Sequence, residues 1–296
     1  MDQPATLNRV HGVLVLDKPE GLSSALAVDR VKHALRVKRA GHGGTLDPMA
    51  TGVLAVCLGE ATKLASYLLA DDKAYVAEGH LGVETDTLDR TGVVTQRRDV
   101  HVTREALLAA IAARMGEQDQ VPPMYSAIKQ DGVRLYRLAR AGEEVERAAR
   151  KIRIDRLELT AFEPPRFTLE IACSKGTYVR SLVADLGTDV GAGAHLTALR
   201  RTRSGRFTLA HAFSLEQVEH ATLVPLTAAT DLPMITIPVD KERHARNGVQ
   251  FTLAQLGAEN LTQFQMLDPA GSLLAIVHAE DGHVVYDRVF HPVTSA

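Results

Sequence analysis

The segment Gly41–Leu54 combines a single carboxylate with residues that shape a loop. Asp47 lies among four glycines, and Pro48 follows it. Glycines allow close backbone approach to a ligand and permit positive φ, and the proline biases Asp47 away from a helix. A carboxylate held in this way can stabilise a sugar cation or attack as a nucleophile. In a tight loop, however, a lone aspartate is most often a turn former or a helix cap.

Other chemical motifs are absent or weak. The stretch 52–60 lacks the lysine and the spacing of a phosphate-binding loop, and 41–44 lacks the third glycine of a dinucleotide-binding turn. The 12 histidines are scattered without zinc-ligand spacing, so no metal is expected. Asp86 and Asp89 could form a phosphotransfer or metal-hydrolase pair, although a solvated acidic turn is the commoner outcome of such a pattern.

The elements that must position Asp47 follow from hydrophobic spacing. Ser23 or Ser24 can cap a helix in which Val28, Val31 and Leu35 share one face. Residues 41–59 are rich in glycine and predict loops. Other predicted helices cover 60–69, 103–115 and 177–190, predicted strands cover 75–81, 152–159 and 167–173, and residues 13–16 form a short apolar run before a turn.

The sequence pattern changes after residue 230 to short apolar segments separated by turns. Short apolar runs at 234–238, 273–277 and 284–290, with a turn at Asp281-Gly282, predict a small β module. A domain boundary is expected near 231–233. Residues 116–150 are polar and predict an insertion on the preceding core.

Composition sets the broad class. The chain has 296 residues, of which 45% are hydrophobic and 24% charged, as in ordinary globular proteins. Its only cysteines, Cys57 and Cys173, exclude a disulfide framework and a four-cysteine zinc site. Because no apolar run reaches membrane-spanning length and no signal peptide is recognisable, a cytoplasmic protein is predicted.

Six ordered blocks of the sequence resemble motifs of the TruB family of tRNA pseudouridine synthases. Gly43 departs from the pattern, since it stands where the family usually has threonine. The blocks are Lys18–Ser24, Gly41–Lys63 around Asp47, Lys73-Ala74-Tyr75, Val121–Lys129 continuing to Tyr136, Cys173–Leu182 around Arg180, and Leu199–Phe207.

The resemblance implies a fold and a domain plan. The fold class is α+β, with a mixed, largely antiparallel sheet, flanking helices and a small PUA-like β domain at the C-terminus. Residues 1–232 would be the catalytic domain, with an RNA-contacting insertion over about 116–150, and 233–296 the small domain. No cofactor is implied.

The resemblance also implies roles for individual residues. Asp47 is the implied catalytic group, and Arg180 its partner, since an arginine beside a carboxylate favours the ionised form and orients it through paired hydrogen bonds. The implied supporting residues are Tyr75 under the extruded base, Tyr178 and Leu199 in the pocket wall, and Lys18 as a brace of the loop. The implied RNA-binding residues are His42, Lys63, Lys129, Arg134, Arg200 and Arg201.

Clustered basic residues suit an RNA partner even though the net charge is −2. Aromatic residues make up only 4%, so recognition of a folded loop by shape fits better than a stacking platform for single strands. For the first cluster a solvated helix face is the simpler interpretation. The clusters are 30–39, Arg134/Arg137/Arg140, Arg147/Arg150/Lys151 and Arg200/Arg201/Arg203/Arg206.

The function that the resemblance implies is isomerisation of the uridine at position 55, in the T-loop of tRNA, to pseudouridine by base flipping, glycosidic cleavage and reattachment at C5. The expected partner is the T-arm stem-loop, without a membrane or an obligate protein partner, and the protein is expected to be a monomer. Whether Asp47 attacks C1′ or removes a proton from C2′ stays open. The alternatives are an RNA-binding or RNA-folding protein without catalysis, and a metal-dependent hydrolase using Asp86 and Asp89.

Overall fold

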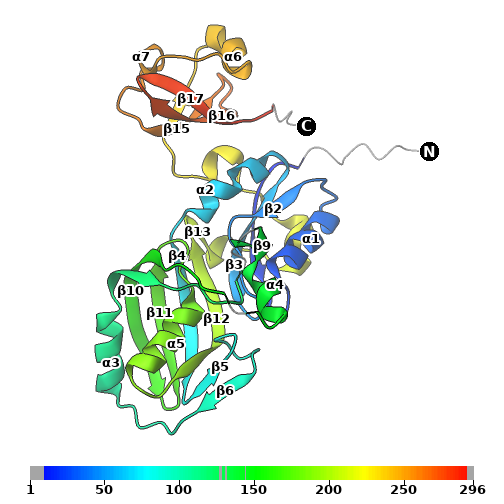
Figure 1. The fold of residues 1–296 in the computed structure, drawn as a ribbon. Coiled ribbons are helices and arrows are strands. Elements are labelled where there is room, and N and C mark those ends of the chain that lie inside the picture. Colours follow the sequence, from blue (N-terminus) through cyan, green and yellow to red (C-terminus); the bar gives the residue numbers. More distant parts are fainter. Residues whose placement is uncertain (1–9, 127–128, 131, 144, 292–296) are drawn as a thin grey trace, which may run out of the picture.

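The computed structural model of the chain describes residues 10–126, 129–130, 132–143 and 145–291. Seventeen strands are found in this part, and most of them belong to one large sheet (Figure 1). The strands are β1 Gly12–Lys18, β2 Ala40–His42, β3 Thr51–Leu58, β4 Lys73–Leu81, β5 Val83–Thr85, β6 Val94–Arg97, β7 Gly116–Gln120, β8 Lys129–Gln130, β9 Val133–Arg134, β10 Arg150–Glu163, β11 Arg166–Cys173, β12 Ala194–Ser204, β13 Phe207–Thr208, β14 Met234–Thr236, β15 Gln263–Leu267, β16 Leu273–Glu280 and β17 His283–Val289.

The large sheet has nine strands in the order β1-β3-β12-β4-β11-β10-β7, with β2 beside β3 and β13 beside β12. Every pairing in it is antiparallel except that of β12 with β3. The mixed, largely antiparallel sheet is thus confirmed. The smaller sheet, β14-β15-β16-β17, forms the predicted C-terminal β module.

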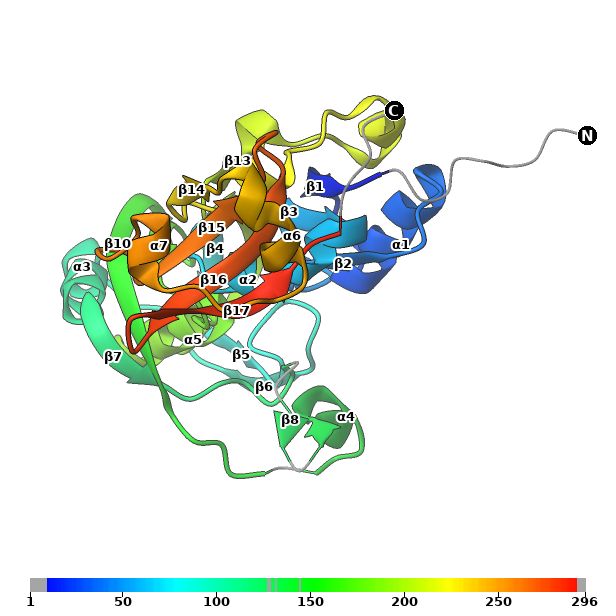
Figure 2. The ribbon, with the colours of Figure 1, turned by 90° about the horizontal axis from the view of Figure 1, so that it is seen from above.

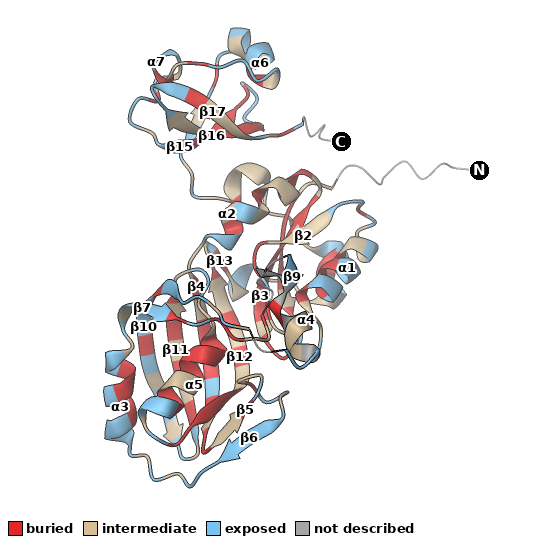
Figure 3. Cartoon of the chain, viewed as in Figure 1, coloured by how far each residue is buried: buried red, intermediate tan, exposed pale blue. Residues whose placement is uncertain are grey.

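The short helices over 59–64 and 65–69 pack against one face of the large sheet, and the three longest helices cover the other. In Figure 3 their buried sides face the sheet, and α5 is buried along most of its length. None of the helices in the described ranges combines the length and apolarity needed to span a bilayer. The α-helices are α1 Ser24–Ala34, α2 Ala65–Leu69, α3 Arg104–Ala113, α4 Leu135–Arg140, α5 Val179–Asp189, α6 Val239–Arg246 and α7 Leu253–Leu256; the 3-10 helices are η1 Gly59–Leu64, η2 Leu209–His211, η3 Leu215–His220 and η4 Leu226–Ala228.

The local signals in the sequence explain where several elements begin. The Ser23 side chain accepts a hydrogen bond from Leu26 N and caps α1, and Thr103 caps α3 in the same way through Ala106 N. The alternating residues of β11 place Phe167, Leu169, Ile171 and Cys173 in the core. These predicted elements are confirmed within a few residues.

Two long strands differ from the sequence-based expectation. Residues 51–58, within a predicted loop, form β3, because its apolar side chains are buried on both faces and its glycines lie at the ends. No strand is predicted over 194–204, where arginines look like a surface patch, yet β12 lies at the centre of the sheet. A 3-10 turn, η1, also replaces the first half of the helix predicted over 60–69.

The polar region 116–150 begins with a strand at the edge of the large sheet. Residues 116–120 form the edge strand β7, which pairs with β10 so that Glu117 faces Arg153 and Asp119 faces Lys151. Opposite charges across an edge pair replace the apolar alternation that would have predicted a strand. The remainder, with the β8–β9 hairpin and α4, projects from the body of the molecule (Figure 2).

The C-terminal module packs against the end of the large sheet that carries α2 (Figures 1 and 2). Alternation along β1 and β3 sends Leu14 and Leu54 into the core under the helices and Val13 and Val53 into a second core. Leu267, Leu273, Ile276 and Phe290 of the module complete this second core. The module begins at Met234 in β14, beside the expected boundary, which itself stays a prediction.

Candidate active site

Asp47 lies on the loop between β2 and β3, and several bonds fix that loop. Gly21 N donates to the Pro48 carbonyl at 2.8 Å, and Ala50 N donates to the Asp47 carbonyl at 3.0 Å. The buried Ser24 hydroxyl accepts from Leu46 N at 2.7 Å and donates to the Leu46 carbonyl at 2.9 Å. The residue before Asp47 is therefore tied to the first turn of α1.

Glycines are required in this loop by close packing. A Cβ on Gly52, where φ is +100°, would lie 2.2 Å from the Arg201 carbonyl oxygen. A Cβ on Gly43 would lie 2.5 Å from Leu68 Cβ, so any side chain at this position would require Leu68 to shift. The loop can thus approach β12 and α2 more closely than a chain with side chains at these positions.

Arg180, on the first turn of α5, forms an ion pair with Asp47 across the sheet face. Its Nε lies 2.9 Å from Asp47 Oδ2, and its Nη2 lies 3.4 Å from Oδ1. The arginine side chain is only 4% exposed, whereas that of Asp47 is 34% exposed. The carboxylate is accordingly the part of the pair that solvent or a ligand can reach.

Three further acceptors hold the Arg180 guanidinium. Nη1 donates to the Thr87 carbonyl at 2.8 Å and lies 3.6 Å from Asp89 Oδ2, and Nη2 donates to the Tyr125 carbonyl at 2.9 Å. With Asp47 this makes two carboxylates and two carbonyls around one side chain. A buried arginine needs such a set of partners to offset its desolvation.

Asp89 was interpreted from the sequence as a solvated acidic turn, and the structure corrects this. The residue is 4% exposed, and its Oδ1 accepts hydrogen bonds from Thr87 Oγ1, Thr91 N and Thr91 Oγ1 at 2.6–2.9 Å. The threonines on either side of Asp89 could have indicated its burial from the sequence, because hydroxyl groups can donate hydrogen bonds to a buried carboxylate. Asp86 is exposed and accepts from Val93 N, so the two acids do not form a hydrolase pair.

The charges around Asp47 oppose one another. Burial raises the pKa of the Asp47 carboxyl above its usual value, and the Asp89 carboxylate adds to this shift. The Arg180 guanidinium and the Lys18 ammonium act in the opposite direction without cancelling it. The arginine therefore opposes the shift that burial imposes on the Asp47 carboxyl, without reversing it.

Lys18 is bonded to the loop of Asp47 and to the turn that follows β1. Its Nζ donates to the carbonyls of Leu22 at 2.7 Å, Pro19 at 2.9 Å and Pro48 at 3.3 Å, and the residue is fully buried. Burial lowers the pKa of the Lys18 ammonium to about 8, although Asp47 acts against this. The side chain links the end of β1 to the residue after Asp47.

Tyr75 and Leu199 lie on the sheet face that carries Asp47 and Arg180. They belong to the adjacent strands β4 and β12, where Leu199 pairs with Ala77, and both are in the core beneath the helices. Burial raises the pKa of the Tyr75 hydroxyl, so the phenol stays protonated near neutral pH. An apolar side chain and an aromatic ring thus lie on the same sheet face as the ion pair.

Tyr178 is the residue immediately before α5. The Gln120 side chain bonds both to Tyr178 N at 2.8 Å and to the Tyr178 carbonyl at 3.1 Å. The end of β7 therefore fixes the start of the helix that carries Arg180. The residue is half-buried, and its place in a pocket wall stays a prediction.

The six residues expected to bind RNA are placed very differently. His42, at the end of β2, is half-buried, and burial with the nearby Arg201 lowers its pKa, which favours the neutral imidazole. Lys63 is partly exposed, and its Nζ donates to Glu60 at 2.6 Å and to the Val289 carbonyl at 2.7 Å. The side chains of Lys129 and Arg134 lie outside the described residues.

Arg200 and Arg201 both have protein partners, although the Arg200 side chain stays 41% exposed. Arg201 is 1% exposed and donates to the carbonyls of Val53, Thr45 and Gly44 at 2.7–3.3 Å, so as placed it cannot reach a phosphate. Arg200 pairs with Val76 on β4, on the sheet face opposite Tyr75, and binds Asp17 through both terminal nitrogens. Successive residues of a strand point to opposite faces of the sheet. A count of clustered arginines in the sequence therefore does not show how many of them reach one surface.

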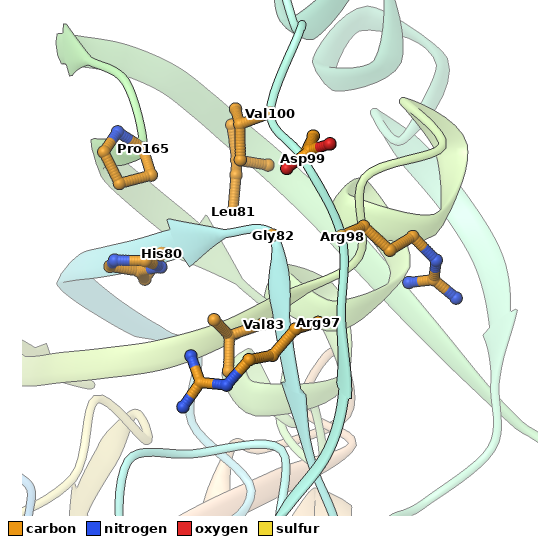
Figure 4. Close-up of a pocket in the computed structure, with 9 residues that line it drawn as sticks. All are labelled: His80, Leu81, Gly82, Val83, Arg97, Arg98, Asp99, Val100 and Pro165. Atoms are coloured by element: carbon orange, nitrogen blue, oxygen red, sulfur yellow. The ribbon is translucent and has the colours of Figure 1, made fainter.

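No group of three or more histidine, cysteine, aspartate or glutamate side chains among the described residues could hold a metal ion. A surface depression of about 470 Å³ lies at the far end of β4 and contains none of the predicted site residues (Figure 4). His80, Arg97, Val100 and Pro165 are among the residues that line it.

Comparisons with known proteins agree on one family. The family model "TruB family pseudouridylate synthase (N terminal domain)" matches residues 32–179, and the model "tRNA pseudouridylate synthase B C-terminal domain" matches 180–241. The tRNA pseudouridine synthase B of Pseudomonas aeruginosa is 54% identical over 210 residues, which cover 71% of this chain and 69% of that protein. That of Ralstonia nicotianae is 45% identical over 298 residues, with 95% of each chain covered.

Solved structures show the same fold. The structure titled "Crystal Structure of a Cbf5-Nop10-Gar1 Complex" contains a chain that superposes with a TM-score of 0.76 at 26% identity, covering 98% of this chain and 88% of that one. A chain of the archaeal box H/ACA Nop10-Cbf5 complex gives a TM-score of 0.73 at 24% identity, over 99% and 90%. The α+β fold with a small PUA-like C-terminal domain is therefore that of pseudouridine synthases.

Proposed function

Because the chain belongs to the TruB family of tRNA pseudouridine synthases, enzymes that isomerise uridine in tRNA, we propose that it converts the uridine at position 55 of the T-loop to pseudouridine. The observation that carries this proposal is the Asp47–Arg180 pair at 2.9 Å, beside Tyr75 and Leu199 on one sheet face. A partly exposed carboxylate with a buried arginine behind it suits a ligand that approaches from the solvent side.

The reaction breaks the bond between N1 and C1′ of the uridine and forms a bond between C5 and C1′. A base in a folded loop must first leave its stack, which costs a few kcal/mol that contacts in the pocket offset. Asp47 either attacks C1′ as a nucleophile or removes the C2′ proton; in both cases it acts as the ionised carboxylate. The C5 proton leaves after reattachment, and N1 acquires a proton, so the product is an isomer of the substrate.

The other side chains have supporting roles in this proposal. Tyr75 is the floor under the extruded uracil, and Leu199 and Tyr178 confine it. Burial keeps the Tyr75 hydroxyl protonated, so removal of the C5 proton by Tyr75 needs prior loss of its own proton. The Arg201 guanidinium, which acts to lower the pKa of Tyr75, favours that loss. His42, on the strand that leads into the catalytic loop, is proposed to contact RNA next to the flipped nucleotide.

The proposed substrate is the T-arm stem-loop, bound by a monomer without an obligate protein partner. A tRNA substrate is available in the cytoplasm, and we propose that location on this ground. One solved relative is a complex with Nop10 and Gar1, and another is a complex with Nop10. These partners belong to those proteins.

The test is turnover by the purified protein on a T-arm transcript. Wild-type protein should form pseudouridine at the single position, whereas Asp47→Asn should lose turnover and keep its RNA dissociation constant within about threefold, because the amide preserves shape without the charge. A fully active Asp47→Asn variant would reject the mechanism. A wild-type protein that binds the transcript tightly and leaves its uridines unchanged would instead be the non-catalytic RNA-binding protein considered from the sequence.

A further inference from the structure

Leu88 has an unusual backbone conformation next to the candidate active site. Three non-glycine residues in the described ranges have positive φ: Arg36 at 51°, Leu88 at 62° and Asp281 at 48°. Arg36 follows the end of α1, and Asp281 lies in the turn between β16 and β17, both positions where left-handed residues are common. Leucine has no polar side chain to stabilise this conformation locally, so its occurrence is a strained exception.

The backbone on both sides of Leu88 contacts Arg180. The Thr87 carbonyl accepts a hydrogen bond from Arg180 Nη1 at 2.8 Å, and Asp89 Oδ2 lies 3.6 Å from the same nitrogen. The φ and ψ angles of Leu88 therefore set the direction of one contact relative to the other. An extended or right-handed helical residue at this position could not present both groups to one guanidinium nitrogen without moving the turn.

The strained residue is held by bonds to the central strand. Leu88 N donates to the Thr85 carbonyl at 3.1 Å, and its carbonyl accepts from Leu196 N at 3.0 Å. Arg90 N donates in return to the Leu196 carbonyl at 2.9 Å. Leu196 lies on β12, three residues before Leu199. The turn that contains Leu88 is therefore attached to the strand that also carries Leu199.

We propose that Leu88 is a positioning residue for Arg180: its left-handed backbone aims the Thr87 carbonyl and the Asp89 carboxylate at the guanidinium, which in turn orients Asp47. The proposal rests on the proposed function and deepens it, because it assigns part of the orientation of the catalytic carboxylate to a residue that does not touch it. The conformation, and not the leucine side chain, carries the role. A strained turn fixed at both ends is stiff, and stiffness at an active site keeps reacting groups in place.

The test compares substitutions that separate backbone from side chain. Leu88→Asn removes the leucine and tolerates the left-handed conformation, whereas Leu88→Val removes it and disfavours that conformation. On the T-arm transcript, Leu88→Val should lower kcat about tenfold or more with KM changed less than about twofold, and Leu88→Asn should keep kcat within about threefold of wild type. Because Arg180 opposes the rise in the pKa of Asp47, Leu88→Val should also move the acid limb of the rate profile to higher pH.

A matched control and a measurement without substrate complete the design. Asp281→Val imposes the same strain in the C-terminal module and should lower the melting temperature while leaving kcat and KM unchanged. In the free protein, solvent exchange of the Arg180 Nε proton, measured by NMR, should be slow in wild type and Leu88→Asn and faster in Leu88→Val. If Leu88→Val unfolds, Leu88→Ala, which is less crowded at positive φ, takes its place.

Each outcome decides the proposal. Equal losses of kcat in Leu88→Asn and Leu88→Val would assign the role to the leucine side chain and overturn it, as would unchanged Nε exchange in Leu88→Val. If wild-type protein forms no pseudouridine, the proposed function fails, and the Nε exchange still decides whether Leu88 positions Arg180.

Discussion

At the scale of single residues, the site depends on unequal exposure within one ion pair. Arg180 is almost completely buried and has oxygen partners in four residues, whereas Asp47 keeps a third of its side chain surface exposed. Burial raises the pKa of Asp47, and the neighbouring charges divide into those that oppose the shift and those that add to it. This division makes opposite predictions for two neutralising substitutions.

The activity should fall as the pH drops through the folded-state pKa of Asp47, since the ionised form is the reactive one. With a raised pKa, this acid limb lies above the value near 3.9 of an unperturbed aspartate. Arg180→Gln removes the charge that lowers the pKa and should move the limb to higher pH; Asp89→Asn removes a charge that raises it and should move the limb to lower pH. The measurement is kcat/KM against pH on one transcript.

Both variants are expected to be slower than wild type, so the comparison uses the position of the limb and not its height. Movement of both limbs in the same direction would show that Asp89 acts on Asp47 only through Arg180. In that case the Asp89 charge does not act directly on the pKa of Asp47.

At the scale of elements, α1 and α5 approach the loop of Asp47 from different parts of the chain. Helix α5 supplies Arg180 from its first turn, and its start is fixed by Gln120 at the end of β7. Helix α1 supplies two neighbouring serines with distinct tasks: Ser23 caps the helix, and Ser24 bonds both backbone groups of Leu46. The loop is thus held by the beginnings of two helices.

Ser24→Ala should loosen the catalytic loop. The substitution leaves the buried Leu46 N and carbonyl without their partner, which should cost about 1–3 kcal/mol of unfolding free energy and also lower kcat, because Asp47 is the next residue. Ser23→Ala is the matched control: it removes a cap, costs about 1 kcal/mol and should leave kcat unchanged. Urea denaturation and turnover on the same preparations check both values, and equal kcat losses in the two variants would contradict the assignment.

At the scale of the whole molecule, the C-terminal module shares a core with the catalytic sheet. Phe290 and Leu273 pack in the same apolar cluster as Val13 and Leu64, and the Gln265 side chain donates to the carbonyls of Thr227 and Leu232. Lys63 and Glu60 add polar contacts to Val289 and to His291 N. The two parts should therefore unfold together.

Phe290→Ala tests this coupling. Removal of a fully buried ring should cost about 3–5 kcal/mol and lower the stability of the entire chain in one transition. Val239→Ala, in α6 of the module and 75% exposed, is the control and should change the free energy of unfolding by less than about 0.5 kcal/mol. A Phe290→Ala protein in which only a small early transition moves would show that the module unfolds by itself.

The elements that depend on local physics could be predicted from the sequence. The caps Ser23 and Thr103, the alternation of β11 and the Asp281-Gly282 turn each arise within a few residues, and all occur as expected. The motifs around Asp47 and Arg180 could also be identified from the sequence, because a family resemblance depends on the order of residue types along the chain. Buried strands such as β3 and β12 were missed because glycines and arginines obscured their pattern.

Contacts between distant segments were decided only by the tertiary structure. Asp47 and Arg180 are 133 residues apart, and the order β3-β12-β4 brings their loop and helix to one face. The same order buries Arg201, turns Arg200 to the opposite face and makes Asp89 a partner of Arg180. No local rule contains this information, because burial and pairing depend on which strands become neighbours, and hydrophobic spacing leaves that order open.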